Sequence, residues 1–175
     1  MEKKWHAIYT RQSCERKVSM LLSKRKISYY LPLNRVSQLY TLESKKYILE
    51  PLFQNMLFVQ IDESEHQQVI RNEDVVNFYY WLGRIAIIDE QEIKDIQFFV
   101  AAYSNITIRK IPIQLKRLYG EDIQLNLPKD FRIEKNFMKT ELHSIGYALE
   151  AEFKGLDENT NNAESPIERF AEIAQ

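Results

Sequence analysis

The stretch from Glu50 to Asp62 constrains the fold of this chain more than any other, because it joins a turn to an uninterrupted apolar run. The polar pair Gln54-Asn55 precedes residues 56–61, which read Met-Leu-Phe-Val-Gln-Ile. A short apolar run with aromatic and β-branched residues, bounded by turn residues, is typical of a strand buried on both faces. We therefore expect a sheet in which this strand is central and covered on either side.

The segments around this strand carry alternating strand and helix signals. We expect strands at residues 5–10, 27–33, 36–42, 46–49 and 75–81, and helices at about 14–26, 64–71 and 90–103. Ser13 and Asp89 are the residue types that cap helix N-termini, and each precedes one of these helices. Antiparallel strands covered by helices make an α+β domain, which we expect to span residues 1–104.

The rest of the chain is less patterned. We interpret residues 105–118 as a basic linker or a partner-binding stretch, residues 119–155 as a small β module, and residues 156–175 as an acidic tail. Within the module, Met138–His143 and Tyr147–Phe153 alternate apolar and polar residues around Gly146, which predicts a hairpin with one solvated face.

The charge is distributed unevenly along the chain, although the net charge is only -1. Residues 1–50 carry 11 Lys/Arg against 4 Asp/Glu, whereas residues 119–175 carry 6 against 12. This asymmetry favours either a basic face for an anionic partner or a merely solvated helix with an acidic tail. The apolar runs are too short to cross a bilayer and no secretory signal is evident, so we expect a cytoplasmic protein.

The sequence lacks a pattern that would indicate catalysis, a metal or a cofactor. His6, His66 and His143 lie in different predicted elements, and four glycines leave no phosphate-binding loop. Cys14 lies on the apolar side of a predicted helix, where a structural thiol is the simpler interpretation. We therefore expect a protein that is not an enzyme.

Four ordered segments resemble the N-terminal domain of NusG-type transcription factors. They are Lys4–Thr10 (Lys-Trp-His-Ala-Ile-Tyr-Thr), Tyr29–Leu33 (Tyr-Tyr-Leu-Pro-Leu), Glu50–Val59 (Glu-Pro-Leu-Phe-Gln-Asn-Met-Leu-Phe-Val) and Ile88–Ile93. Phe78–Arg84 is most similar to the UpxY-type (RfaH-like) antiterminators of capsular-polysaccharide operons in Bacteroides-like bacteria. The resemblance implies an antitermination or processivity factor with a C-terminal KOW barrel.

The resemblance also implies a polymerase-binding surface. Positions that match it are Tyr9, Phe53, Met56 and Phe58, which would contact the β′ clamp helices of RNA polymerase through an apolar depression. The alternative for these residues is core packing, which periodicity does not exclude. Successive strand residues point to opposite faces, so one face of 56–61 is available for the core and the other for a partner helix.

Two further contacts follow from the resemblance. His66 lies near the segment that meets the β-subunit gate loop in specialised relatives, and a solvated helix face is the alternative. Arg11, Gln12, Arg16 and Lys17 match a region that touches the non-template DNA strand, although nascent RNA remains an alternative. Cations there would meet phosphates and Gln12 a base edge.

The chain departs from the family pattern in two places. Gln54 and Met56 replace the usual proline and tyrosine, which is expected to loosen the turn. The Gly-rich turn of a KOW barrel is missing between Gly120 and Gly155, so we expect a degenerate module. The rival hypothesis is a general RNA-binding or translation-associated protein that uses the basic first third. In either case we expect a monomer.

Overall fold

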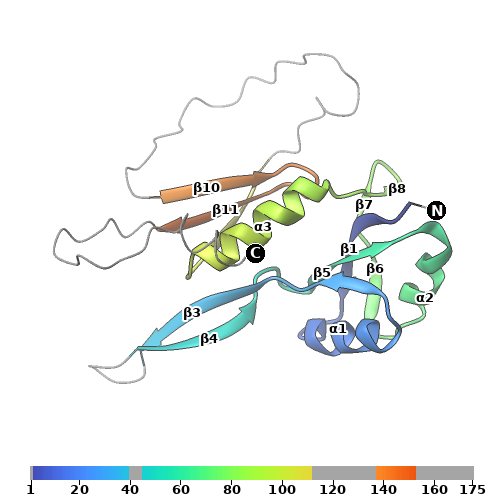
Figure 1. The fold of residues 1–175 in the computed structure, drawn as a ribbon, viewed down its shortest axis with the longest axis horizontal. Helices are drawn as coiled ribbons and strands as arrows, with labels where there is room; N and C mark the ends of the chain where they lie inside the picture. Colours follow the sequence, from blue (N-terminus) through green and yellow to red (C-terminus); the bar gives the residue numbers. More distant parts are fainter. Residues whose placement is uncertain (1, 40–44, 112–136, 153–175) are drawn as a thin grey trace, which may run out of the picture.

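The fold is built around a four-stranded antiparallel sheet. The computed structural model describes residues 2–39, 45–111 and 137–152. Within them the strands of the main sheet lie in the order β2 (Ser28–Tyr30), β5 (Met56–Ile61), β1 (Lys4–Thr10) and β6 (Val75–Phe78). The strand expected to be central, β5, lies inside the sheet between β2 and β1 (Figure 1).

The register of β1 and β5 fixes which side chains share a face. Tyr9 lies opposite Met56 and Ala7 opposite Phe58, so these side chains point to one side of the sheet. Leu57 points to the other side and is fully buried, as are Phe58 and Ala7. The prediction of a strand buried on both faces is therefore confirmed.

Two helices cover the Leu57 face. Val18 and Leu22 of α1 (Glu15–Lys24) pack in one cluster with Leu57. Val69 of α2 (His66–Ile70), which follows a 3₁₀ turn at Glu63–Glu65, belongs to the same cluster. Both helices are short, so burial against the sheet rather than intrinsic helix propensity stabilises them.

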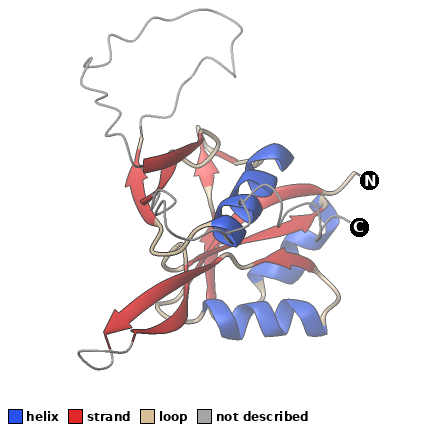
Figure 2. Cartoon of the chain, turned by 60° about the vertical axis from the view of Figure 1, so that its left-hand side comes forward, coloured by secondary structure: helices blue, strands red, loops and turns tan. Residues whose placement is uncertain are grey.

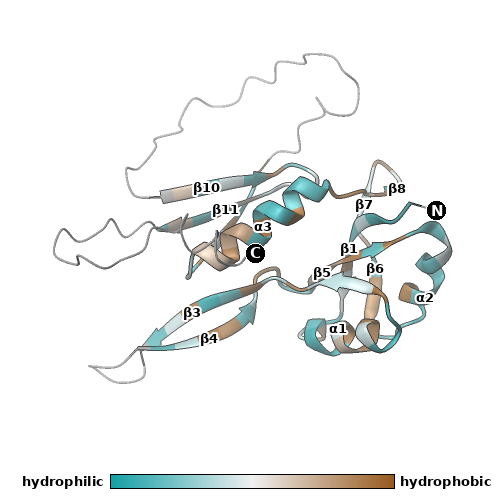
Figure 3. Ribbon diagram, in the orientation of Figure 1, coloured by the Kyte–Doolittle hydropathy of each residue, from teal (hydrophilic) through white to brown (hydrophobic). Residues whose placement is uncertain are grey.

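The opposite face of the sheet is covered by α3 (Glu90–Ala102). The helix is hydrophilic over its first half and mostly apolar over its second (Figure 3). The predicted cap is confirmed, because an Asp89 carboxylate oxygen accepts a hydrogen bond from Gln91 N at 3.0 Å. Ile96 and Phe99 pack in the cluster that also contains Phe58.

A two-stranded ribbon extends from this body (Figures 1 and 2). It consists of β3 (Leu33–Leu39) and β4 (Lys45–Pro51), in the place where a hairpin is predicted, and its expected tip lies outside the described residues. Its base is fixed by Asn34, whose side chain donates to Ile106 O at 2.9 Å and accepts from Ile106 N at 3.1 Å.

A second sheet lies beside α3 and has the strand order β10-β11-β9. The predicted hairpin is present as β10 (Phe137–Leu142) and β11 (Tyr147–Glu152). The third strand, β9 (Thr107–Lys110), pairs with β11, so the prediction of a linker was wrong for this segment. Ile106 is buried and Ile108 is partly buried against the core, and this packing draws the segment into the sheet.

Three details differ from the expectations or lie beyond them. Ser13 does not cap α1, because it adopts a φ of 59° and Cys14 occupies the cap position without a side-chain hydrogen bond. The strand predicted for 75–81 is interrupted after β6, and Tyr80–Trp81 (β7) instead pairs with Arg84–Ile85 (β8).

The predictions for 112–136, most of the β module included, and for the tail at 156–175 fall outside the described residues.

No helix in the described part of the chain is long and apolar enough to cross a membrane.

Candidate functional site

The structure brings Tyr9, Phe53, Met56 and Phe58 together on one side of the main sheet. We call these four residues the candidate docking face. Phe53 and Met56 are each 3% exposed, Phe58 is fully buried, and Tyr9 is half-buried. The rings of Phe53 and Phe58 meet edge to face, with centroids 5.6 Å apart. The prediction that Met56 and Phe58 share a face of the strand is therefore confirmed.

The C-terminal sheet covers this face. The ring of Tyr147, at the start of β11, lies 5.8 Å from that of Phe53, and Leu142 and Leu149 belong to the same buried cluster. The depression that the family resemblance implies is thus filled by the chain's own strands. Phe53 is therefore buried beneath the start of β11.

A hydrogen bond between α3 and the β10–β11 turn holds the cover in place. The Glu92 carboxylate, itself only 4% exposed, accepts from Ser144 N at 3.0 and 3.1 Å. Hydrogen bonds to a charged group contribute about 1.5–3 kcal/mol each. The predicted hairpin is therefore held against the first domain through its apolar face, which includes Leu149 and Ala151, while Glu152 on the other face is exposed.

Three tyrosines gather at the edge of the candidate docking face. The rings of Tyr9 and Tyr79 lie 6.1 Å apart, and Tyr147 is close to both. Burial raises the pKa of Tyr9, with a smaller contribution from Tyr147, and it raises the pKa of Tyr79 in the same way. The three phenols come from distant segments, so local sequence patterns carried no signal for this group.

The turn before β5 is held by a residue that sequence reasoning missed. Asn55 has a φ of 57°, and its N–H donates to Glu15 Oε1 at 2.6 Å while its carbonyl accepts from Thr10 N at 2.8 Å. Glu15 is 5% exposed although it lies in the first turn of α1. The turn therefore stays fixed without the proline that the family usually has at Gln54. An acidic residue in the first helical turn was the available signal, but it is usually exposed.

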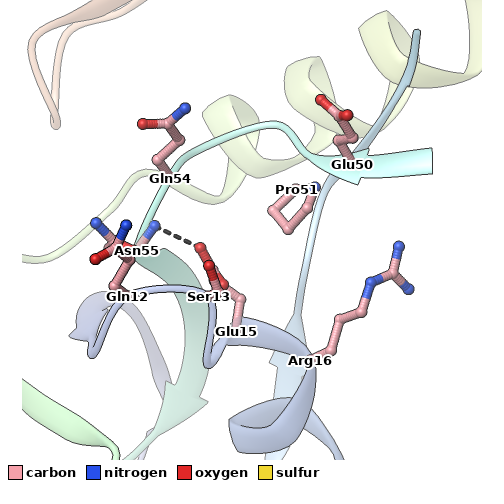
Figure 4. Close-up of a pocket in the computed structure, with 8 residues that line it drawn as sticks. All are labelled: Gln12, Ser13, Glu15, Arg16, Glu50, Pro51, Gln54 and Asn55. Atoms are coloured by element: carbon pink, nitrogen blue, oxygen red, sulfur yellow. Dashed lines mark hydrogen bonds between the residues drawn. The ribbon is translucent and has the colours of Figure 1, made fainter. Parts of the chain in front are cut away.

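A polar pocket of about 450 Å³ opens beside this turn (Figure 4). Its walls come from the N-terminus of α1, the end of β4 and the turn itself. Its polar side chains are those of Gln12, Ser13, Glu15, Arg16, Glu50, Gln54 and Asn55. The pocket thus combines one guanidinium and one hydroxyl with two carboxylates and three amides.

The four candidate nucleic-acid residues lie together at the start of α1, but two are engaged. Arg16 Nη2 donates to Leu49 O at 2.7 Å. Lys17 Nζ lies 2.7 Å from Asp74 Oδ2, and this contact lowers the pKa of the carboxyl and raises the pKa of Lys17. Arg11 and Gln12 are exposed.

His66 lies on the opposite side of the sheet from the candidate docking face. Its ring centroid is 5.3 Å from that of His6 and 5.0 Å from that of Phe78. His6 is 6% exposed and pairs through Nδ1 with Ala86 O at 2.8 Å. Burial is the main cause that lowers the pKa of His6, and the carbonyl of Ala86 opposes it. The structure therefore does not group His66 with the other candidate polymerase contacts.

Within the described ranges, no three His, Cys, Asp or Glu side chains are arranged to hold a metal ion.

The described residues thus form an α+β protein whose main sheet carries an apolar face beneath a second sheet. The sequence model described as "Transcription termination factor nusG" matches residues 3–97, which is more than half of the 175 residues. The chain therefore belongs to the NusG family of transcription factors.

A solved structure is also similar, that of "Domain interaction in Thermotoga maritima NusG". It is 15% identical, covers 84% of this chain and 97% of its own, and superposes with a TM-score of 0.42. A comparison with curated proteins finds no match.

Proposed function

We propose that this chain is a transcription elongation and antitermination factor that binds RNA polymerase and suppresses pausing or termination. Family membership supports a role in transcription elongation or termination. The observation that carries the finer proposal is that Tyr9, Phe53, Met56 and Phe58 assemble on a single apolar face. Such a face suits an amphipathic helix laid into a groove, and the proposed partner is the pair of β′ clamp helices.

Docking in this proposal is coupled to displacement of the C-terminal sheet. Because β11 covers Phe53, only those molecules in which the C-terminal sheet is displaced can bind polymerase. The apparent dissociation constant rises as that fraction falls. The covered state thus keeps the factor weakly active until polymerase or another partner captures the open form.

The start of α1 faces nucleic acid in the proposed complex. Arg11 and Gln12 are exposed there, and Arg16 and Lys17 follow on the same helix. We propose that these residues contact the non-template DNA strand, or the nascent RNA, close to the polymerase. His66, on the other side of the sheet, is the proposed contact to the β gate loop.

We also propose that the target genes are capsular or surface polysaccharide operons. The support is the resemblance of Phe78–Arg84 to UpxY-type antiterminators, a segment that contains β7 and the turn leading into β8. The gene should then lie at the head of such an operon. A position among ribosomal-protein genes would instead favour a housekeeping factor.

The docking proposal is tested with the host RNA polymerase. Both Phe53→Leu and Met56→Ala keep an apolar side chain and should weaken co-purification with polymerase as well as terminator read-through in transcription assays. Met20→Ala is the matched control, because Met20 is 61% exposed on α1. Circular dichroism and urea unfolding establish that each variant is folded. If folded Met56→Ala and Phe53→Leu bind and function like wild type, the docking face is wrongly assigned.

A further inference from the structure

Two histidines meet beneath the short helix α2, on the side of the main sheet away from the candidate docking face. The ring of His66, the first residue of α2, lies nearly perpendicular to that of His6 on β1, with centroids 5.3 Å apart. The Phe78 ring of β6 lies 5.0 Å from His66 and 6.1 Å from His6. On β5 the residue opposite His6 is Val59. The two imidazoles are therefore part of the packing that holds α2 on the sheet.

This pair is poorly placed to carry positive charge while it stays packed. His6 is buried, and its Nδ1 pairs with the carbonyl oxygen of Ala86 at 2.8 Å. His66 Nε2 is also buried and has no hydrogen-bond partner among the described residues. A protonated imidazole donates through both ring nitrogens, so a charged His66 would bury an N–H group without an acceptor. Hydration of that group would recover the free energy that its burial costs.

The cations near the pair act against its protonation. Burial is the main cause that lowers the pKa of His6, and the carbonyl of Ala86 opposes it. The His66 ring and Lys4 lower the pKa of His6 further. Arg25 of α1 donates to a carbonyl oxygen of α2 at 2.6 Å and so brings another positive charge to this helix. A proton added to either imidazole therefore meets like charges.

The carboxylates of the preceding turn do not compensate for these cations. Glu65 accepts from Lys3 Nζ at 2.8 Å and from Asp62 N at 3.2 Å. The Asp62 carboxylate caps the turn by accepting from Ser64 N at 2.8 Å, and Glu63 is exposed. Among the described residues, no carboxylate forms an ion pair with either histidine of the pair.

We propose that the contact between His6 and His66 is a pH-sensitive latch, which keeps α2 on the main sheet at neutral pH and releases it in mild acid. The helix has five residues, of which Val69 is buried, so its attachment depends on few side chains. After release both rings are hydrated and take up protons at the ordinary histidine pKa of about 6.5. The released state thus binds protons more readily than the packed state, and acid favours release.

The functional consequence rests on the proposed function, because His66 is the proposed contact to the β gate loop. Gln67 and Gln68 of the same helix are exposed. A released α2 no longer holds these side chains in a fixed position. Binding to polymerase should therefore weaken in mild acid, while the candidate docking face on the other side of the sheet keeps its own contacts.

Hydrogen–deuterium exchange of the full chain tests the latch without polymerase. The probes are the amides of Arg71 and Asn72, which donate to carbonyl oxygens of α2. After correction for intrinsic exchange, their protection should fall between pH 7.5 and 5.5 by about tenfold for one proton taken up on release, and by up to about a hundredfold for two. They should be less protected than β5 throughout, because local release requires less free energy than unfolding. Protection that does not change with pH, or that equals that of β5, would overturn the proposal.

Variants identify the groups that take up the protons. His6→Asn and His66→Gln each keep a polar side chain that does not titrate, and each should reduce the pH response of α2. The double variant should lose the response. His143→Asn is the matched control, because His143 lies in the turn between β10 and β11 and its removal should leave the response unchanged. A response of wild-type size in both single variants would refute the latch, whether or not the double variant folds.

The host polymerase separates the latch from the proposed function. Wild type and His6→Asn are compared at pH 7.5 and 6.0, and the ratio of their dissociation constants removes the pH dependence of polymerase itself. His6 is not a proposed polymerase contact, so its variant should bind like wild type at the higher pH and more tightly than wild type at the lower one. A constant ratio, or no binding of polymerase at all, combined with acid release of α2 would support the latch and count against the β gate-loop contact. A constant ratio without acid release would overturn the latch.

Discussion

The Phe53 and Tyr147 rings pack with their centroids 5.8 Å apart, joining the loop before β5 to the first residue of β11. This contact places the C-terminal sheet over the side chains that the family resemblance assigns to polymerase. The same residues therefore serve as core in the covered state and, in our proposal, as an interface in the open state. The two interpretations of the apolar face belong to two states of one molecule.

Removing the Tyr147 ring should strengthen binding to polymerase. Tyr147→Ala deletes a contact that exists only when the sheet covers Phe53, and it should lower the free energy of unfolding by about 1–3 kcal/mol. Destabilising the covered state raises the fraction of molecules able to bind polymerase. The apparent dissociation constant for polymerase therefore falls. Titration of polymerase with labelled protein measures the apparent dissociation constant. Tyr80→Ala, at a tyrosine that is 47% exposed, is the control that should leave the affinity unchanged.

Glu15 should be the residue on which the docking turn depends. Glu15→Ala removes the acceptor for Asn55 N and leaves a partly buried donor unpaired, so the free energy of unfolding should fall by about 1–3 kcal/mol. Glu15→Gln keeps an acceptor oxygen, so its free energy of unfolding should fall by less than that of Glu15→Ala. Urea denaturation measures both, with Glu63→Gln at an exposed site as the comparison. Equal stability of Glu15→Ala and wild type would mean that the turn is fixed by other contacts.

Stability should fall in mild acid because of His6. The folded state holds the pKa of His6 below its ordinary value of 6.5, chiefly through burial, with the His66 ring and Lys4 opposing the charged form as well. The unfolded chain then binds the proton more readily, so this contribution is fully present above pH 6.5 and is lost as the pH falls from 6.5 through the lower pKa of the folded state. Urea unfolding between pH 7.5 and 5 should show a steeper loss in wild type than in His6→Asn. Parallel curves would refute this assignment.

Asp74 should restrain nucleic-acid binding by pairing with Lys17. Asp74→Asn releases the ammonium for phosphate, so affinity for single-stranded DNA should rise. The slope of log affinity against log salt should steepen by up to about 0.7. Lys17→Ala should have the opposite effect, and Lys94→Ala on α3 provides a control cation. Fluorescence anisotropy at several salt concentrations measures the slope. If Asp74→Asn binds no better than wild type, Lys17 does not contact the strand.

The local parts of the fold could be predicted because their causes are local. The apolar run at 56–61 identified β5, Asp89 identified the start of α3, and Gly146 identified the β10–β11 turn. Alternation along β5 also predicted that Met56 and Phe58 share a face. These inferences need only strand geometry and capping chemistry.

The long-range parts could not be predicted from the same patterns. That Tyr147 covers Phe53 depends on how two sheets pack, and no spacing in either segment encodes it. The burial of Glu15 depends on a turn forty residues later in the chain. The sequence patterns at Thr107–Lys110 resembled a basic linker because its two outward cations hid the pairing of β9 with β11.

Hydrogen–deuterium exchange of the unmodified protein, alone and bound to its host polymerase, tests the central claim most directly. In the free chain the amides of β10 and β11 should be protected by their pairing and by the Glu92–Ser144 contact. On polymerase, we expect faster exchange at residues 142–149 and retained protection of β5. Undiminished protection of 142–149 in a fully formed complex would show that the candidate docking face stays covered, and it would contradict the account.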